Sequence, residues 1–306
     1  MSKCQICGEE FSSEGGLHRH IKKHGLTMAE YYTKFYPRNN LLTGDPLPFK
    51  NKDQYFNEDF STRQQLLKWC QTASENEVAP YILKLLKKRI TSKDLKLGPS
   101  HVELRLSSLP TIDIYRQHFG SYTEACKQAG APLLFGSHAP EEFHQPLGRD
   151  VKIFIDTREQ QPLTFNNSES MKLDFGDYAV GGEDYAYTYV DRKGEQDFKS
   201  TLSKNNLERF RNELSRAREF NSYVHIVVES DLNQIYKHNR WGPHQSNLKY
   251  IYHNMRVFAH EFAGHCQFLF TGSRENSQEL IPKLLVMGDK LWDVDLQYYI
   301  DRDGVG

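Results

Sequence analysis

Residues 175–197 read FGDYAVGGEDYAYTYVDRKGEQD, and this stretch decides the fold of the second half of the chain. Together with its flanks it predicts one strand over residues 171–180 and another over residues 185–193. Asp177 and Asp191 then each lie near a strand end. Lys193 shares a strand face with Asp191, because alternate residues of a strand point to the same side. The stretch therefore predicts two carboxylates and one ammonium group in one pocket.

Such a pocket suits the hydrolysis of a phosphodiester bond. That reaction needs a cation to hold the phosphate and activate water, and Mg²⁺ or Mn²⁺ prefers oxygen ligands. Asp177 and Asp191 can share one ion, and Lys193 can orient the water and offset charge in the transition state. The order of an acidic residue, a gap and then acid-x-Lys is typical of the restriction-endonuclease-like fold, although such triples are common by chance.

The sequence around this stretch predicts an α/β domain over residues 148–306, with helices packed on a mixed sheet. Further strands are expected over residues 151–156, 223–229 and 267–271. Helices are expected over residues 197–203, 206–220 and 248–262, followed by a last helix. The strands come first and then alternate with helices.

Four blocks of sequence, in order, resemble one nuclease family. They are Asp156-x-Arg158-Glu159, Gly176-Asp177, Asp191-Arg192-Lys193 and Asp197. This order resembles the XPF-type nuclease domain, which carries Gly-Asp, a variable gap, Glu-Arg-Lys, three residues and Asp, and which uses a divalent metal to cut branched DNA. The resemblance covers roughly residues 150–285.

The resemblance implies a role for each matched residue. Asp177 and Asp191 would bind Mg²⁺ or Mn²⁺, and Lys193 would be catalytic. Asp156 and Glu159 are assigned to the catalytic set as well. The remaining matched residues would support the metal, the water or the phosphate, and they are Arg158, Arg192 and Asp197.

The chain departs from the family pattern in two ways. Asp191 replaces the family's Glu, which shortens the reach of the carboxylate by one methylene group. Only about 20 residues follow residue 285, too few for the tandem helix-hairpin-helix module with which relatives bind DNA and dimerise. We therefore expect the N-terminal half to target DNA.

The N-terminal region, residues 1–48, contains a second candidate metal site. Its four ligands have the spacing C-x₂-C-x₁₂-H-x₃-H and are Cys4, Cys7, His20 and His24. Two thiolates and two imidazoles at this spacing suit tetrahedral Zn²⁺, and Phe11 and Leu17 supply a minimal core. The pattern matches a two-Cys two-His zinc finger and predicts a small ββα fold that depends on the metal for stability.

The finger is expected to have weak sequence selectivity. Its base-reading positions, counted back from His20, are Ser13, Gly16 and Arg19, and only Arg19 is a strong reader, with a preference for guanine. A protein-binding or purely structural finger is the alternative. The capping box from Thr27 to Glu30 begins another helix, which we expect to pack on the finger.

Residues 49–140 are expected to form a helical module that binds DNA. Between Leu83 and Arg105, seven basic residues stand against two acidic ones, which is consistent with a phosphate-contacting surface and equally with a solvated helix face. Two helices that meet at Gly120-Ser121 resemble the small repeat that accompanies many homing endonucleases. The candidate DNA contacts of this module are Lys87, Lys88, Arg89, Arg116 and Lys127.

Composition limits the class of protein. The chain has 306 residues, a formal net charge of −1 and no apolar run long enough to cross a membrane, so any affinity for DNA must come from local charge. No secretory signal is visible. Five scattered or paired cysteines argue against a disulfide framework and favour a reducing compartment inside the cell, such as the cytoplasm, nucleoid or nucleus.

These observations predict a metal-dependent DNA endonuclease. Its substrate would be either a specific, homing-like site or branched DNA, and the nuclease domain could form a homodimer. The alternative is a non-catalytic DNA-binding or regulatory protein that uses a nuclease-like domain as a scaffold. The change from Glu to Asp at position 191 is the feature that favours this alternative.

Overall fold

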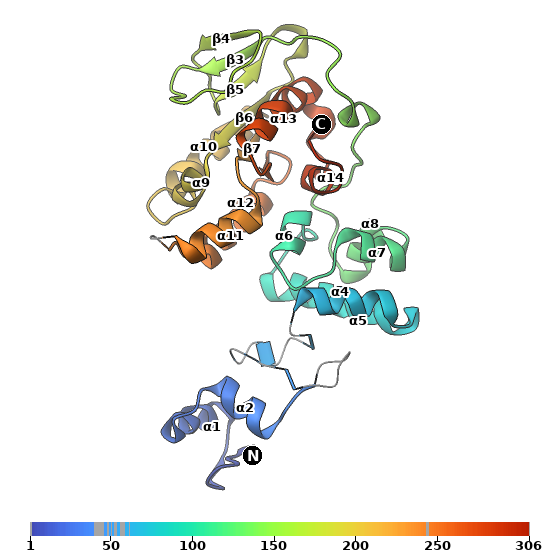
Figure 1. The fold of residues 1–306 in the computed structure, drawn as a ribbon, viewed down its shortest axis with the longest axis vertical. Helices are drawn as coiled ribbons and strands as arrows, with labels where there is room; N and C mark the ends of the chain where they lie inside the picture. The colour runs from blue at the N-terminus through green and yellow to red at the C-terminus, as the bar shows by residue number, and fades with distance from the viewer. Residues whose placement is uncertain are drawn as a thin grey trace. The chain divides into compact units, whose positions relative to one another are not determined.

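The computed structural model describes residues 2–39, 46–47, 49, 51, 54–55, 59–60, 62–242 and 245–305. The chain forms two compact units (Figure 1). The first unit contains Met1–Ile82 and Ser108–Pro110, and the second contains Leu83–Ser107 and Thr111–Gly306. Most of the expected helical module therefore belongs to the same unit as the expected nuclease domain, and the division into three domains stays a prediction.

The first unit begins with the ββα arrangement expected of the finger. Its elements are β1 (Ser2–Lys3), β2 (Glu10–Phe11), α1 (Glu14–Ile21), the 3-10 turn η1 (Lys22–His24) and α2 (Met28–Phe35). The capping box of Thr27 and Glu30 is present. Tyr31 on α2 is fully buried against Leu17 and Ile21, so this helix enlarges the small core of the finger as expected.

Further helices follow over residues 62–129, which the structure describes without a gap. They are α4 (Arg63–Thr72), α5 (Glu75–Lys93), α6 (His101–Arg105), α7 (Ile112–Phe119) and α8 (Tyr122–Ala129). Helix α7 ends at Gly120, and Ser121 caps α8 by accepting a hydrogen bond from the backbone N–H of Glu124. Both helix boundaries predicted here are confirmed.

A six-stranded mixed sheet is the centre of the second unit. Its order is β4 (Ser168–Met171), β3 (Ile153–Asp156), β5 (Tyr178–Val180), β6 (Thr188–Lys193), β7 (Tyr223–Val228) and β8 (Cys266–Phe270). Strand β3 is parallel to β4, and β6, β7 and β8 are parallel to one another. Strand β5 is antiparallel to both of its neighbours, β3 and β6. The predicted mixed α/β sheet is confirmed. The strand predicted over residues 171–180 begins only at Tyr178, and β4 was not expected.

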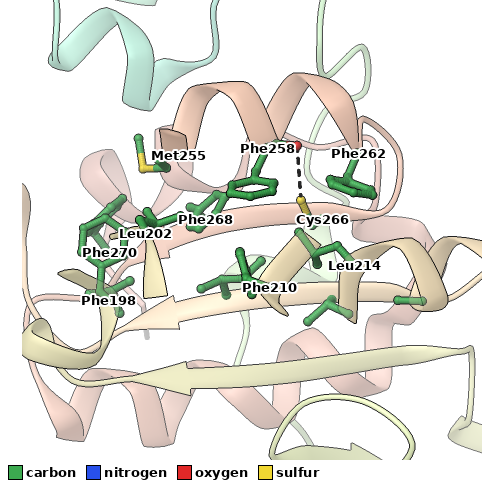
Figure 2. Packing of buried hydrophobic residues seen from close by; sticks show 14 of the residues in the cluster. Phe198, Leu202, Phe210, Leu214, Met255, Phe258, Phe262, Cys266, Phe268 and Phe270 are labelled. Carbon is green, nitrogen blue, oxygen red and sulfur yellow. Dashed lines mark hydrogen bonds between the residues drawn. The ribbon is translucent and has the colours of Figure 1, made fainter. Parts of the chain in front are cut away.

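Helices cover both faces of this sheet. The helices of the second unit that follow β6 are α9 (Glu195–Thr201), α10 (Leu207–Glu219), α11 (Leu232–Trp241), α12 (Leu248–Glu261), α13 (Arg274–Met287) and α14 (Leu296–Asp303). Short 3-10 turns lie before β6 at Glu141–His144 and Gly182–Asp184, and after it at Gly288–Leu291. Aromatic side chains of α9, α10, α12 and β8 form the core on one face (Figure 2). Helix α13 contacts β5, β6 and β7. No helix in the described part of the chain is long and apolar enough to span a membrane.

The register of β6 assigns its residues to these two faces. Asp191 pairs with Ile226 and Lys193 with Val228, and both of these β7 residues belong to the aromatic core. Asp191 and Lys193 therefore lie on the side of α10, as the alternation predicts. Arg192, between them, points to the opposite side.

Candidate active site

The turn before β5 places Asp177 beside β6. Gly176 has a φ of +58°, and a Cβ atom there would lie 2.6 Å from the carbonyl oxygen of Val190, so only glycine fits. The backbone N–H of Asp177 donates to that same carbonyl at 2.7 Å. The backbone N–H of Arg192 donates to Oδ2 of Asp177, also at 2.7 Å. The carboxylate is thus fixed at the strand that carries Asp191.

Substituting this glycine should therefore damage the site directly. We expect Gly176→Ala to lower the free energy of unfolding by about 1 to 3 kcal/mol, since it combines an unfavourable φ with a backbone clash. Thermal unfolding measures the effect. Gly182→Ala is a matched control, because its φ is also positive but nothing lies within 4 Å of the added Cβ. Equal losses for the two variants would contradict the close approach at Gly176.

Lys193 and Asp191, two residues apart on β6, form a close ion pair. The Nζ atom lies 2.9 Å from Oδ1 and 2.8 Å from Oδ2 of the carboxylate. Their side chains are only 13% and 8% exposed. Burial alone would lower the pKa of Lys193, but the adjacent Asp191 charge outweighs it and raises that pKa, so the ammonium stays charged.

Asp177 is the uncompensated group of the site. Burial and then the neighbouring charge of Asp191 raise its pKa to about 8, although the Arg192 N–H and the Lys193 charge favour the ionised form. Its side chain makes no ion pair with any residue that the structure describes. Two carboxylates that share one ammonium group leave an excess of negative charge, which a bound cation would relieve.

This raised pKa has a measurable effect on stability. The ordinary pKa is 3.8 and the folded value is about 8, so the folded protein keeps a proton that the unfolded chain releases. The free energy of unfolding should therefore fall as pH rises from about 4 to about 8, and Asp177→Asn should be more stable than the original protein at pH 8. Urea unfolding without added divalent cations tests this.

A control separates this effect from a general change in charge. Asp174→Asn makes the same change at an exposed position three residues away. We expect Asp174→Asn to keep the pH dependence and Asp177→Asn to flatten it. If Asp177→Asn retained the full slope, Asp177 would not be the group that holds the proton.

Glu213 on α10 is a third carboxyl group at the site, and the sequence analysis missed it. Burial and then the charge of Asp191 raise its pKa, whereas Lys193 lowers it. The Lys193 Nζ atom also lies over the Phe210 ring, one helical turn before Glu213, at 5.6 Å from the ring centroid. The available signal was a glutamate next to the apolar stripe of α10, three residues after Phe210.

Asp156 has a different environment from the other predicted catalytic residues. Its carboxylate accepts hydrogen bonds from the backbone N–H and the guanidinium of Arg158, and from the backbone N–H of Leu173 at 2.7 Å. Burial raises its pKa, but these hydrogen bonds outweigh burial, so the net shift is downward. These contacts connect the end of β3 to the loop that leads to Gly176. The geometry therefore favours a positioning role for Asp156 and Arg158.

Glu159 and Arg192 belong to an ion network on the other face of β6. The Arg192 guanidinium lies 3.1 Å from Glu159 and 2.9 Å from Glu229. Arg274 on α13 lies 3.2 Å from Glu229 and donates to the carbonyl of Gln161. The network holds the loop after β3 against β6, β7 and α13. Asp197, in the first turn of α9, is exposed.

The donor set at Asp177 and Asp191 fits a small divalent cation. In the described ranges, no third His, Cys, Asp or Glu ligand atom completes a cluster with this pair within 4.8 Å. Mg²⁺ is commonly bound by one or two carboxylates, with water and substrate oxygens as its other ligands. A pair of carboxylates therefore suits Mg²⁺ or Mn²⁺ better than it suits Zn²⁺.

The finger contains a complete four-ligand set. The ligand atoms of Cys4, Cys7, His20 and His24 all lie within 4.8 Å of one another. The Cys7 sulfur lies 3.1 Å from Nε2 of His20, and the Cys4 sulfur lies 3.6 Å from Nε2 of His24. Bond lengths of about 2.3 Å for sulfur and 2.0 to 2.1 Å for nitrogen give tetrahedral edges of about this size. The cluster could bind zinc.

The predicted DNA contacts lie on several elements. Arg19 on α1 is exposed, and so are Lys87 and Lys88 on α5. Arg89 lies 3.4 Å from the buried Glu103. Arg116 donates to the hydroxyl oxygen of Tyr298 on α14 at 3.0 Å, so it helps to hold α7 and α14 together within the second unit. The DNA-binding role of these residues stays a prediction.

Comparison with known proteins gives a limited result. No family model and no curated protein matches the chain. Two similar solved structures are XPF from Aeropyrum pernix, at 20% identity, and XPF from Aeropyrum pernix in complex with DNA, at 19% identity. Each has a TM-score of 0.34, and the matched region covers 44% of this chain. The same region covers 64% and 63% of the two XPF chains, so this chain spans less than two thirds of their length. Likeness at this level assigns no family.

Proposed function

We propose that this protein is a DNA endonuclease that depends on a divalent metal and hydrolyses phosphodiester bonds. The observation that supports it best is the largely buried group of Asp177, Asp191 and Lys193, in which two carboxylates have only one cationic partner. A purely structural ion pair would not need the second buried carboxylate. A site that binds a cation and a phosphate does need it.

Each residue of the site has a specific task in this proposal. Asp177 and Asp191 would hold Mg²⁺ or Mn²⁺, which supplies Lewis-acid stabilisation of the phosphate and a lower pKa for bound water. Lys193 presents a permanent positive charge at Nζ, where it can orient water and stabilise the transition state. Burial and the charge of Asp191 raise the pKa of Glu213, which favours its protonated form, so Glu213 would be a candidate proton donor at the site.

The rest of the chain would bring DNA to this centre. Cys4, Cys7, His20 and His24 would bind structural Zn²⁺. The finger and the basic helices would then contact DNA phosphates, and the substrate would be a homing-like site or branched DNA. A homodimer through the nuclease domain belongs to the same proposal, and sedimentation equilibrium tests it.

The direct test is cleavage. Purified zinc-loaded protein is incubated with a random plasmid library and with branched DNA, with and without Mg²⁺, and the product ends are mapped. We expect cleavage only with Mg²⁺ or Mn²⁺, and the ends would distinguish site-specific from branched substrates. DNA binding without cleavage under every condition would instead support the non-catalytic, regulatory alternative.

A further inference from the structure

A basic cavity lies between α5 and α12, inside the second compact unit. Its volume is about 580 Å³, within the range of small-molecule sites. Helix α5 contributes two cationic residues one turn apart, and α12 contributes residues at helical spacing on one face. We call this the basic pocket, and the residues that define it are Arg89, Lys93, Lys249, Tyr250, His253 and Arg256.

Positive charge is in excess in the basic pocket. The one carboxylate in its lining is Glu103, which is 3% exposed. Glu103 lies 3.4 Å from Arg89, 4.0 Å from Arg256 and 2.7 Å from His260. Neither Lys93 nor Lys249 forms an ion pair in the described part of the chain. Four cationic side chains therefore line a pocket that contains one carboxylate, and only Arg89 and Arg256 of the four contact it.

The electrostatics show that these cations repel one another. The pKa of Lys93 is lowered, mainly by burial and next by the positive charges of Arg89, Arg256 and Lys249. Burial and then Arg89 lower the pKa of Arg256, and Glu103 only partly offsets this. A lysine on an ordinary solvated helix face would not face three further cations. An anion bound here would stabilise all four groups at once.

The walls of the pocket narrow the class of anion. Tyr250 stands at the rim beside Lys249 and is 37% exposed. The hydroxyl group of Tyr252, which also lines the pocket, is buried and has no hydrogen-bond partner among the described residues. An aromatic ring beside a basic groove is the combination by which proteins bind single-stranded nucleic acid, with bases stacked on the ring and phosphates on the cations.

We propose that the basic pocket binds a phosphate of a single-stranded DNA segment, with the neighbouring base stacked on Tyr250. This proposal adds a DNA-binding site to the proposed function, and the choice of DNA as the bound molecule rests on that function. The pocket is formed by α5 and α12, whereas Asp177, Asp191 and Lys193 lie at β5 and β6. We call the group of Asp177, Asp191 and Lys193 the acidic centre, and none of these three residues lines the basic pocket.

The test measures binding separately from cleavage. Fluorescence anisotropy follows a labelled single-stranded oligonucleotide bound to the full-length, zinc-loaded protein, without Mg²⁺. For the double variant Lys93→Ala/Lys249→Ala we expect affinity to fall about tenfold or more. The slope of log affinity against log salt should become shallower by about 0.7, the value for one lost phosphate contact on a single strand.

Matched variants make this test specific. Tyr250→Ala should weaken binding at least about fivefold, whereas Tyr250→Phe should bind normally, because stacking needs only the ring. Lys290→Ala removes an exposed lysine from the turn before α14 and should have no effect. Equal losses in Lys290→Ala and the double variant would overturn the proposal, as would unchanged binding in the double variant. So would displacement of the oligonucleotide by inorganic phosphate alone with no dependence on Tyr250.

The result does not depend on whether the protein cuts DNA. Because Mg²⁺ is absent, an inactive acidic centre would leave the binding measurement intact. Conversely, if the double variant bound normally while the original protein cleaved DNA with Mg²⁺, the basic pocket would be wrong and the endonuclease proposal would stand.

Discussion

Replacing Lys193 by alanine is expected to reduce Mg²⁺-dependent DNA cleavage by about a hundredfold or more. The ammonium group lies 2.9 Å and 2.8 Å from the two oxygens of Asp191 and is almost fully buried, so no other cation can take its place easily. The measurement is the single-turnover rate of plasmid cleavage. DNA binding without Mg²⁺ should change less than about threefold, because Lys193 acts on the reacting phosphate rather than on the length of the duplex.

Two controls make the loss of cleavage interpretable. Lys290→Ala removes one positive charge at an exposed site and should cleave normally. Thermal unfolding of Lys193→Ala shows whether the unpaired Asp191 has destabilised the fold. Undiminished cleavage in a folded Lys193→Ala protein would contradict the proposed role of this residue.

Loss of the zinc ligands is expected to unfold the finger completely. The apolar core of the finger is small, and metal binding to such sites contributes about 10 to 16 kcal/mol. His24→Ala should abolish stoichiometric zinc binding and remove amide protection from residues 2–35. Lys23→Ala, which changes the adjacent exposed residue, should leave both intact. Hydrogen exchange with mass spectrometry measures protection along the whole chain.

The same experiment shows how far the effect extends. The six-stranded sheet has its own core of aromatic and aliphatic side chains, so protection of β5 to β8 should not change in His24→Ala. A finger that kept its protection without zinc would contradict the assignment of the four-ligand cluster.

Those parts of the fold that depend on local sequence were predictable. The spacing of Cys4, Cys7, His20 and His24 specifies a compact cluster because two ligands lie close together in the hairpin and two lie about one turn apart, on α1 and in η1. Strand alternation placed Lys193 beside Asp191, which the ion pair confirms. Gly120 and Ser121 marked the end of one helix and the start of the next because both residues have strong local preferences.

Other parts were missed because their determinants are not local. Strand β4, Ser168–Met171, is exposed at all four positions, so it has no apolar pattern and exists only through pairing with β3. Helix α11 is an exception, because its capping box of Asp231 and Gln234 is a local signal that was not recognised. Glu213 reaches the site through the packing of α10 on the sheet, and its place next to the apolar stripe of α10 does not by itself identify the site that it reaches.

The distinction between catalytic and positioning residues also required the structure. Asp156 and Asp177 both follow the family pattern, but the carboxylate of Asp156 is fully hydrogen-bonded and that of Asp177 is not. Arg192 and Glu159 pair with each other on the face opposite Asp191, where they hold the loop after β3. Their contribution to the site is therefore expected to be indirect.

Crystals soaked with Mn²⁺ and measured for anomalous scattering test the central claim most directly. The account predicts an anomalous peak within ligand distance of carboxylate oxygens of both Asp177 and Asp191, and its loss in Asp177→Asn. A zinc-loaded, folded protein with no peak at this pair, or with the peak retained in Asp177→Asn, would contradict it.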